Sequence, residues 1–221
     1  MEGSSVDRAA VYRALGDPRR LRIVDALQLS DRSTGDLAAL TGLATNLLAF
    51  HLDVLERAGV ITRTVSEGDA RRRYVSLAPA VLPLLGDPPA LEPRPDDRVL
   101  FVCTANSARS QLAAGLWQAR TGRPARSAGT QPARRVHPQA VAVAQRHGLD
   151  LTNATPVGYP ELDIVPELLV SVCDRAHEGT HHLDVPRLHW SIPDPVPHGP
   201  KAFEDAFQRI AARIDRLVRA A

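Results

Sequence analysis

The sequence predicts two domains: a mainly α domain with a β-hairpin in the N-terminal half, and an α/β domain with a four-stranded parallel sheet in the C-terminal half. The 221 residues exceed the usual size of a single domain. Six of the seventeen residues from 79 to 95 are Pro, a density that excludes a continuous helix or a central strand. Before this segment the hydrophobic pattern is that of helices followed by a hairpin, and after it strands and helices alternate. We therefore expect domains at residues 1–78 and 97–221, joined by a Pro-rich linker at 79–96.

The composition is that of a globular protein that can form hydrophobic cores, with 44% hydrophobic and 24% charged residues. No run of 18 apolar residues occurs, and the first residues lack the basic and apolar segments of a signal peptide. We expect a cytoplasmic protein with no membrane partner. Of the 27 basic residues 26 are Arg, whose planar guanidinium suits bidentate binding of phosphate-like oxyanions.

The N-terminal half begins with helical periodicity. Pro18 suits the first position of a helix, and an apolar period follows it to about Leu29. Ser33 and Thr34 can cap a second, short helix, which Gly42 ends. Two helices separated by a short connection are therefore expected before residue 43.

A longer helix from about residue 45, with leucines at i, i+4 and i+7, is expected to follow. The pattern then alternates at residues 60–65 and 73–77, on either side of a polar turn, as in a two-stranded hairpin. A helix-turn-helix followed by a basic hairpin, or wing, is a DNA-binding arrangement, in which the second helix enters the major groove and wing arginines meet phosphates.

The segments LGDPRRLRIVDAL, TGDLAALTGL and HLDVLERAGVI resemble the ArsR-type winged helix-turn-helix repressors, over about residues 7–78. The resemblance implies a homodimer that binds operator DNA and regulates transcription. The recognition helix has no Arg or Lys before Arg57, and the absence of cysteine from this domain excludes thiolate sensing within it. His51 fits a helix-surface or interface residue better than a metal ligand. The resemblance implies that DNA bases are contacted by Thr45, Asn46, Leu47 and Phe50. It implies that the DNA backbone is contacted by Arg63, Arg71, Arg72 and Arg73.

The C-terminal half begins with an apolar run at 98–103 that predicts a buried parallel strand ending at Cys103. A polar loop and a helix to about Arg120 follow. Backbone amides of such a loop and the helix N-terminus form a concave anion site, which also favours a thiolate. A guanidinium at Arg109 can hold two oxygens of a tetrahedral oxyanion while the Cys103 sulfur attacks its centre. The expected oxyanion-binding residues are Thr104, Ala105, Asn106, Ser107, Ala108 and Arg109.

The rest of the chain alternates strands and helices, as an α/β layer fold requires. Strands are expected near 126–128, at 168–173 and near 188–190, and helices at about 138–147 and 202–219. With the first strand, they predict a four-stranded parallel sheet.

The segments VLFVCTANSARSQ, SAGTQP, HPQAVAVAQRHGLDL and HWSIPDP resemble the low-molecular-weight protein tyrosine phosphatase fold, and most closely its arsenate reductase branch. The resemblance covers about residues 97–220. It implies that Cys103 is the nucleophile, Arg109 the oxyanion clamp and Ser110 a hydroxyl donor to the thiolate. It also implies that Asn106 shapes the loop and that Asp194 is the general acid.

The reductase reaction needs a second thiol, whereas a phosphatase needs only one cysteine. Cys173 is the one internal candidate, and its two interpretations, a resolving thiol or a buried apolar residue, stay open. With no third cysteine, an external reductant is required: mycothiol with a redoxin, glutathione with glutaredoxin, or thioredoxin. We expect no bound cofactor. We also expect no metal, because the spacing of four histidines matches no tight ligand motif: His177, His181, His182 and His189.

The sequence thus favours a thiol-dependent arsenate reductase, with possible residual phosphatase activity, fused to an ArsR-type DNA-binding domain and acting in arsenic detoxification. Two alternatives remain: a transcriptional regulator that uses the oxyanion loop as a sensor, and a protein tyrosine phosphatase.

Overall fold

The computed structural model describes residues 7–91, 98–162, 165–179 and 184–221. These residues form two compact units, which divide the chain between Pro89 and Ala90, except that Glu67–Asp69 are grouped with the second unit. The linker was expected at 79–96, but its first residues, from Pro79 to Leu84, form a 3₁₀ helix in the first unit. Its last residue, 96, lies outside the described residues.

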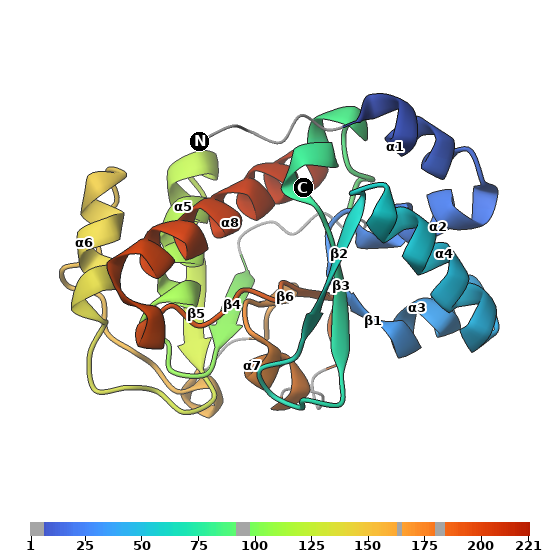
Figure 1. The fold of residues 1–221 in the computed structure, drawn as a ribbon. Helices are drawn as coiled ribbons and strands as arrows, with labels where there is room; N and C mark the ends of the chain where they lie inside the picture. Colours follow the sequence, from blue (N-terminus) through green and yellow to red (C-terminus); the bar gives the residue numbers. More distant parts are fainter. Residues whose placement is uncertain (1–6, 92–97, 163–164, 180–183) are drawn as a thin grey trace. The chain divides into compact units, whose positions relative to one another are not determined.

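The first unit has a helical body and a three-stranded antiparallel sheet in the order β1-β3-β2 (Figure 1). The hairpin of β2 and β3 confirms the predicted wing, and β1 adds two residues that the alternation pattern was too short to reveal. Its elements are α1 (Arg8–Leu15), α2 (Pro18–Leu27), β1 (Arg32–Ser33), α3 (Thr34–Thr41), α4 (Thr45–Arg57), β2 (Ile61–Val65), β3 (Arg73–Leu77) and the 3₁₀ helix η1 (Pro79–Leu84).

The helix starts follow from local capping. The Asp17 carboxylate accepts hydrogen bonds from the backbone N–H groups of Arg19 and Arg20, before α2. Ser33 and Asp36 form a capping box at α3. Gly42 ends α3 with a φ of 67°, a left-handed conformation that glycine adopts without steric cost. The predicted helix boundaries in this unit are therefore confirmed to within about two residues.

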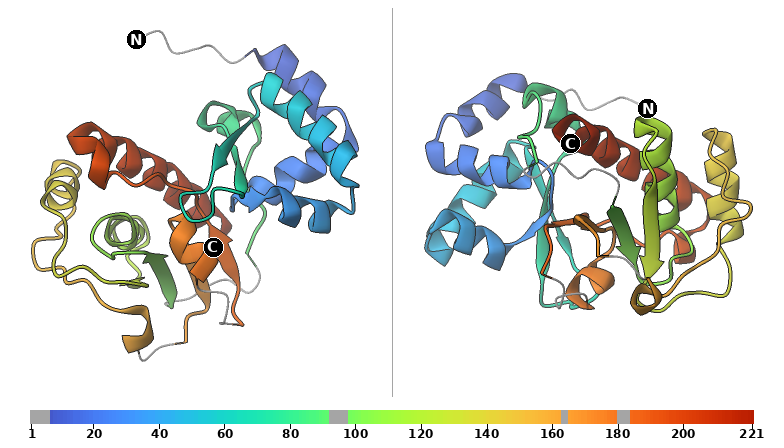
Figure 2. Two further views of the ribbon diagram at one scale, coloured as in Figure 1. Left: turned by 60° about the horizontal axis from the view of Figure 1, so that its bottom comes forward. Right: turned by 180° about the vertical axis from the view of Figure 1, so that it is seen from behind.

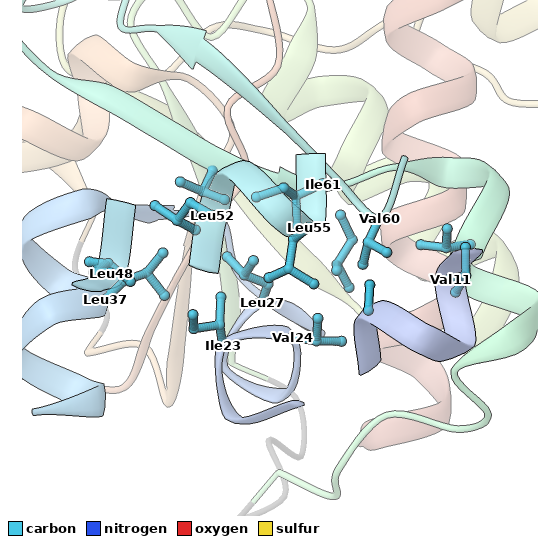
Figure 3. Close-up of a cluster of buried hydrophobic side chains, with 14 residues drawn as sticks. Val11, Ile23, Val24, Leu27, Leu37, Leu48, Leu52, Leu55, Val60 and Ile61 are labelled. Carbon is cyan, nitrogen blue, oxygen red and sulfur yellow. The ribbon is translucent and has the colours of Figure 1, made fainter. Parts of the chain in front are cut away.

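The core of the first unit forms where α1, α2, α3, α4 and the sheet meet (Figure 3). The three periodic leucines of α4, at positions 48, 52 and 55, are all buried in it. Val81 of η1 is also fully buried in this cluster, which explains why the first part of the expected linker belongs to the winged domain. No single helix among the described residues has the length and apolar composition to span a membrane. Among these residues, the bent pair of α3 and α4 meets the length and composition criteria only when the two helices are taken together.

The second unit is an α/β domain whose four parallel strands run in the order β5-β4-β6-β7, as predicted. Helix α5 packs against β4 and β5 and is covered by α8, which α6 also contacts, whereas α7 contacts β4 and β6 (Figures 1 and 2). Its elements are β4 (Val99–Cys103), α5 (Arg109–Thr121), β5 (Ala125–Gly129), α6 (Pro138–Arg146), η2 (Tyr159–Glu161), β6 (Leu168–Ser171), α7 (Asp174–Gly179), β7 (Arg187–His189), η3 (Val196–His198) and α8 (Gly199–Ala220).

Strand β4 is buried along its whole length, which explains its unbroken apolar sequence. The Phe101 ring lies between Trp117 and Trp190, with ring centroids 6.4 and 6.0 Å away. This packing fixes the strand whose carboxyl end is Cys103. Strand β6 ends at Ser171, two residues earlier than predicted, so Cys173 lies in the connection to α7.

Candidate active site and recognition helix

The loop between β4 and α5 is held by backbone hydrogen bonds to the segment that follows β5. Its carbonyl groups accept these bonds, so the shape of the loop is set by a part of the chain more than twenty residues away. The pairs join Thr130 N to Cys103 O (3.1 Å), Gln131 N to Thr104 O (2.8 Å), Ala133 N to Ala105 O (2.9 Å) and His137 N to Ser107 O (2.8 Å).

Asn106 is the centre of this loop. Its φ of 48° is the one positive value among the described residues other than glycine, and Asn tolerates that conformation better than most residues. The fully buried side chain donates from Nδ2 to Ser110 Oγ (2.8 Å), and its Oδ1 accepts from the backbone N of Val157 (2.8 Å). Asn106 therefore joins the loop to α5 and to a distant segment.

The buried Cys103 sulfur lies inside the loop, 3.2 Å from the backbone N of Asn106 and 3.1 Å from Ser110 Oγ. Because Ser110 Oγ already accepts from the Asn106 amide, its own proton can point to the sulfur. Two donors thus face Cys103 Sγ, and hydrogen bonds to sulfur stabilise the thiolate form.

Arg109, the first residue of α5, is buried with its guanidinium beside this sulfur. Its Nη1 donates to the carbonyl of Ile192 (2.7 Å), and its Nη2 lies 3.3 Å from Asp194 Oδ1. Burial alone would lower the pKa of Arg109, but the nearby Cys173, Cys103 and Asp194 raise it above its ordinary value. The group therefore stays positively charged in a buried place, as an oxyanion clamp requires.

Cys173 is also brought to this loop, from the connection between β6 and α7. Its Sγ lies 3.5 Å from Thr104 Oγ1, and the side chain is buried. Burial raises the pKa of the Cys173 thiol, with Arg109 acting in the opposite direction and Cys103 in the same one. At neutral pH the resting Cys173 is therefore a thiol.

Gly129 and Gln111 support the loop, although the sequence analysis assigned neither a role. A Cβ on Gly129 would lie 2.7 Å from Thr104 O and 3.0 Å from the Asn106 backbone N, so only glycine fits. Gln111 Nε2 donates to the carbonyls of Asn106 and Thr155, both at 3.2 Å. An isolated glycine inside a strand pattern was the available signal for Gly129.

Around the loop the second unit forms an open depression whose sides are mainly polar and aliphatic. No group of three His, Cys, Asp or Glu side chains in the described part of the chain is placed to hold a metal ion. Of the four histidines considered as ligands, His177 and His189 bond to Ser171, and His181 and His182 lie outside the described residues. The residues along the sides of the depression include Ala133, Arg135, His137, Pro138, Gln139, Val196 and Pro197.

In the first unit, α4 exposes the residues expected to face bases. Thr45 and Asn46 are exposed in its first turn, and Leu47 and Phe50 are 37% and 58% exposed. The three periodic leucines of the same helix point into the core, so one face is left for a partner (Figure 3). The wing residues expected at the DNA backbone, at positions 71, 72 and 73, are exposed.

Arg63 departs from the expectation that it faces the DNA backbone. Its Nη2 lies 2.7 Å from Asp53 Oδ1, and its Nε donates to Glu56 Oε2 at 3.0 Å. The hydrogen bond to Glu56, followed by that to Asp53, raises the pKa of Arg63 above its ordinary value. Two carboxylates of α4 already occupy this guanidinium, so it joins the wing to the recognition helix.

His51 also departs from its expected place, because it is buried within the domain and only 2% exposed. Neither ring nitrogen has a hydrogen-bond partner among the residues that the structure describes. Its position on α4, one residue before the buried Leu52, turns it toward the core.

Comparison with known proteins agrees with the division of the chain into two domains. Residues 98–221 match the family model of the low molecular weight phosphotyrosine protein phosphatases, and residues 17–63 match that of the bacterial regulatory proteins of the arsR family. An arsenate reductase of Brevibacillus brevis is 32% identical over 125 residues, which are 54% of this chain and 92% of that protein. The transcriptional repressor SdpR of Bacillus subtilis is 35% identical over 52 residues, or 24% of this chain and 58% of the repressor.

A solved structure of an arsenate reductase from Archaeoglobus fulgidus superposes with a TM-score of 0.50 at 29% identity, covering 55% of this chain and 98% of that one. Together, these matches cover both units in chain order. The chain therefore belongs to the low molecular weight phosphotyrosine protein phosphatase family through its C-terminal domain, which is fused to an N-terminal DNA-binding domain of the arsR family.

Proposed function

We propose that the protein is a thiol-dependent arsenate reductase that acts in arsenic detoxification and carries an operator-binding domain. The observation that carries the proposal is the placement of two buried thiols, Cys103 and Cys173, beside one charged arginine, Arg109. A phosphatase needs one thiol at such a loop. A second thiol at the same place is what reduction of a bound oxyanion requires.

In the first step, arsenate binds to the loop with two oxygens on Arg109, and the Cys103 thiolate attacks arsenic. Asp194, a carboxylate while it is paired with Arg109, takes up a proton from solvent when arsenate displaces it, and passes this proton to the departing oxygen, which leaves as water. The product is an adduct with a bond between Cys103 Sγ and As(V). The ion pair of Asp194 with Arg109 keeps both groups at the entrance of the loop before substrate arrives.

In the second step, Cys173 loses its proton to an oxygen of the As(V) adduct and attacks Cys103 Sγ. The S–As bond breaks, and its electron pair stays on arsenic, which leaves as arsenite in the As(III) state. Two thiols have become one disulfide and have supplied the two electrons. An external thiol system, based on mycothiol, glutathione or thioredoxin, then reduces the disulfide. The raised pKa of Cys173 keeps this thiol protonated until the adduct forms.

The sides of the depression favour a small inorganic oxyanion over an aryl phosphate. Apart from the imidazole of His137, the described residues that line it supply no aromatic ring to stack on a phenol. Arsenate and phosphate have nearly the same shape, so the loop itself does not distinguish them. The second thiol does.

The test is arsenite release from arsenate by the purified protein with each of the three thiol systems in turn. We expect release with at least one system and its loss in Cys103→Ser. Cys173→Ser should also abolish release while leaving adduct formation at Cys103 intact. Hydrolysis of an aryl phosphate that persists in Cys173→Ser, with no arsenite from any donor, would instead assign the protein to the phosphatases. Absence of both activities in folded protein would favour the sensor alternative.

We also propose that α4 and the wing bind operator DNA as a homodimer, with base contacts by the exposed residues of α4. The exposed side chains on that helix and the arginines of the wing support this part of the proposal. Phe50→Ala should weaken binding to operator DNA. Arg73→Ala should reduce the slope of log affinity against log salt by about one, while Arg63→Ala should leave that slope unchanged. Equal slopes for both arginine variants would contradict this assignment.

A further inference from the structure

We propose that His189 is a positioning residue for Cys173, holding the turn at 171–174 through both nitrogens of its ring. The proposal rests on the proposed function, in which Cys173 resolves the adduct at Cys103. It concerns a buried polar cluster that the mechanism above does not use: Ser171, Asp174, His177 and His189.

The imidazole of His189 bridges the residues on either side of Cys173. His189 ends β7, pairs with Ser171 of β6 in the sheet register, and is only 1% exposed. Its Nδ1 lies 3.1 Å from Ser171 Oγ, and its Nε2 lies 3.1 Å from Asp174 Oδ1. Ser171 precedes Cys173 by two residues and Asp174 follows it by one. One ring therefore closes the turn that presents the sulfur.

The ring itself is held in place by its neighbours. His177 stacks on it with ring centroids 4.1 Å apart and planes 14° apart, and His177 Nδ1 lies 3.1 Å from the same Ser171 Oγ. Burial raises the pKa of Asp174, but the hydrogen bonds from His189, from the backbone N–H of Glu67 and from Ser191 together bring it below its ordinary value. Asp174 thus remains a carboxylate that accepts from the ring.

Pairing with β4 fixes the start of this turn, and the first residues of α7 fix its end. Val172 N donates to Val102 O at 2.8 Å, which extends the pairing of β6 with β4 by one residue. Beyond Val172 the sheet ends, and Cys173 Sγ contacts Thr104 Oγ1 at 3.5 Å and the backbone N–H of Ala176 at the start of α7. The direction in which Cys173 points therefore depends on how Asp174 is held.

The two chemical steps differ in their dependence on this turn. Cys103 is held by Asn106 and Ser110, neither of which belongs to the cluster. The disulfide step, in contrast, needs the Cys173 sulfur in line with the S–As bond. Displacement of a reacting atom by about 1 Å can cost about 100-fold in rate. Loosening the turn should therefore slow the second step and spare the first.

The test uses two variants that each keep one of the two hydrogen bonds. In His189→Asn the amide can replace Nδ1 and reach Ser171, and in His189→Gln it can replace Nε2 and reach Asp174. Asp174→Asn keeps an oxygen acceptor for the ring and serves as the conservative variant. His147→Gln is the matched control, because that histidine stacks on Phe207, away from the cluster.

Two rates are measured on each full-length variant. The first is alkylation of Cys103 by iodoacetamide in a Cys173→Ser background, which reports the nucleophile alone. The second is formation of the Cys103–Cys173 disulfide after one addition of arsenate without external thiol, followed by mass spectrometry. We expect the disulfide rate to fall at least tenfold in both His189 variants and less in Asp174→Asn. Alkylation should stay within about twofold, and the control should match the wild type on both.

An arm with diamide, which oxidises adjacent thiols without arsenate, separates the two proposals. If wild-type protein forms no disulfide with arsenate, the resolving role of Cys173 fails, and diamide still reports whether His189 sets the distance between the thiols. If folded His189 variants form the disulfide at the wild-type rate with diamide, the positioning role is wrong. A parallel fall of alkylation and disulfide formation would also overturn it, since the effect would then be on the whole site.

Discussion

The oxyanion loop of the C-terminal domain and the exposed face of α4 in the N-terminal domain are built in opposite ways. In the loop, Cys103, Asn106 and Arg109 are buried, and each side chain has partners within hydrogen-bonding distance. On α4, Leu47 and Phe50 are exposed and are positioned only by the helix that carries them. A site that stabilises charge on a small ion must be preorganised and dry, whereas a surface for DNA must stay open.

Two of the five arginines expected in functional roles, Arg109 and Arg63, also differ in their surroundings. Arg109 is buried beside two thiols and pairs with Asp194 at the edge of the oxyanion loop. The Arg63 guanidinium forms ion pairs with Asp53 and Glu56 inside its own domain. The same residue type therefore lines a loop shaped for an anion in one domain and links two elements in the other, and its neighbours decide which.

The largest effect is expected from Gly129→Ala, which tests how tightly the loop is packed. The new Cβ would meet Thr104 O at 2.7 Å, a backbone atom that cannot move without shifting the loop. We expect arsenite release to fall by about 100-fold or more, with little change in DNA binding. Steady-state kinetics beside Gly115→Ala, whose Cβ would have ordinary contacts of 3.6 Å or more, provide the check. Similar activity in both variants would contradict the close packing.

Leu55→Ala should destabilise the other domain. Leu55 is fully buried in the core of the winged domain, so truncation leaves a cavity worth about 3 kcal/mol of unfolding free energy. Denaturant titration, with DNA binding and arsenite release measured on the same samples, would show where the loss falls. We expect DNA binding to be lost at lower denaturant and the reductase midpoint to stay. A common shift of both midpoints would show that the domains unfold together.

His51→Leu sharpens the contrast between satisfied and unsatisfied buried polar groups. His51 has no hydrogen-bond partner among the described residues, and an unsatisfied buried polar group costs about 1–3 kcal/mol. An apolar side chain of similar size should raise the stability of the winged domain by about 1 kcal/mol, visible as a higher Tm. His189→Leu, which removes a satisfied ring, should lower the stability of its own domain. A lower Tm for His51→Leu would show that the imidazole makes a contact through water.

The smallest effect concerns the surface of the C-terminal domain, at Glu204. Arg146 donates to this carboxylate at 2.8 Å and is the main reason, with Gln208 and His147, that the pKa of Glu204 is lowered to about 2. A lowered carboxylate pKa stabilises the fold above the unfolded value of 4.5, and this contribution is lost as the pH falls toward about 2. Because Glu204 is one-third exposed, solvent screening limits the gain to less than about 1 kcal/mol.

Glu204→Gln should therefore lower Tm slightly at pH 7, and the difference from the wild type should disappear near pH 2–3. Thermal unfolding across this range measures it. Asp205→Asn, which removes the exposed ion pair with Lys201, is the control and should change less. A Tm difference that grows at low pH would contradict a stabilising effect of the Glu204 carboxylate.

Much of the fold was predictable because it depends on local chemistry. Capping residues, glycine ends and apolar periods belong to single segments, so α2, α3, α4 and the wing were expected at nearly their observed positions. The strand that ends at Cys103 and the helix that starts at Arg109 follow from one uninterrupted stretch of sequence. Strand β1 was not expected because it has only two residues. Helix α1 was not expected because it buries only two residues, Val11 and Ala14, which make a weak apolar period.

The sequence by itself thus determined the two-domain organisation, the elements and the residues of the oxyanion loop. Only the tertiary structure decided which distant residues meet. It brought Cys173 beside a loop seventy residues earlier in the chain, because β6 pairs with β4. It also placed Gly129 against that loop, turned Arg63 onto α4, buried His51 and set His189 across the turn that carries Cys173. The physical reason is the same in each case: contact between segments depends on strand order and packing, which no single stretch of sequence contains.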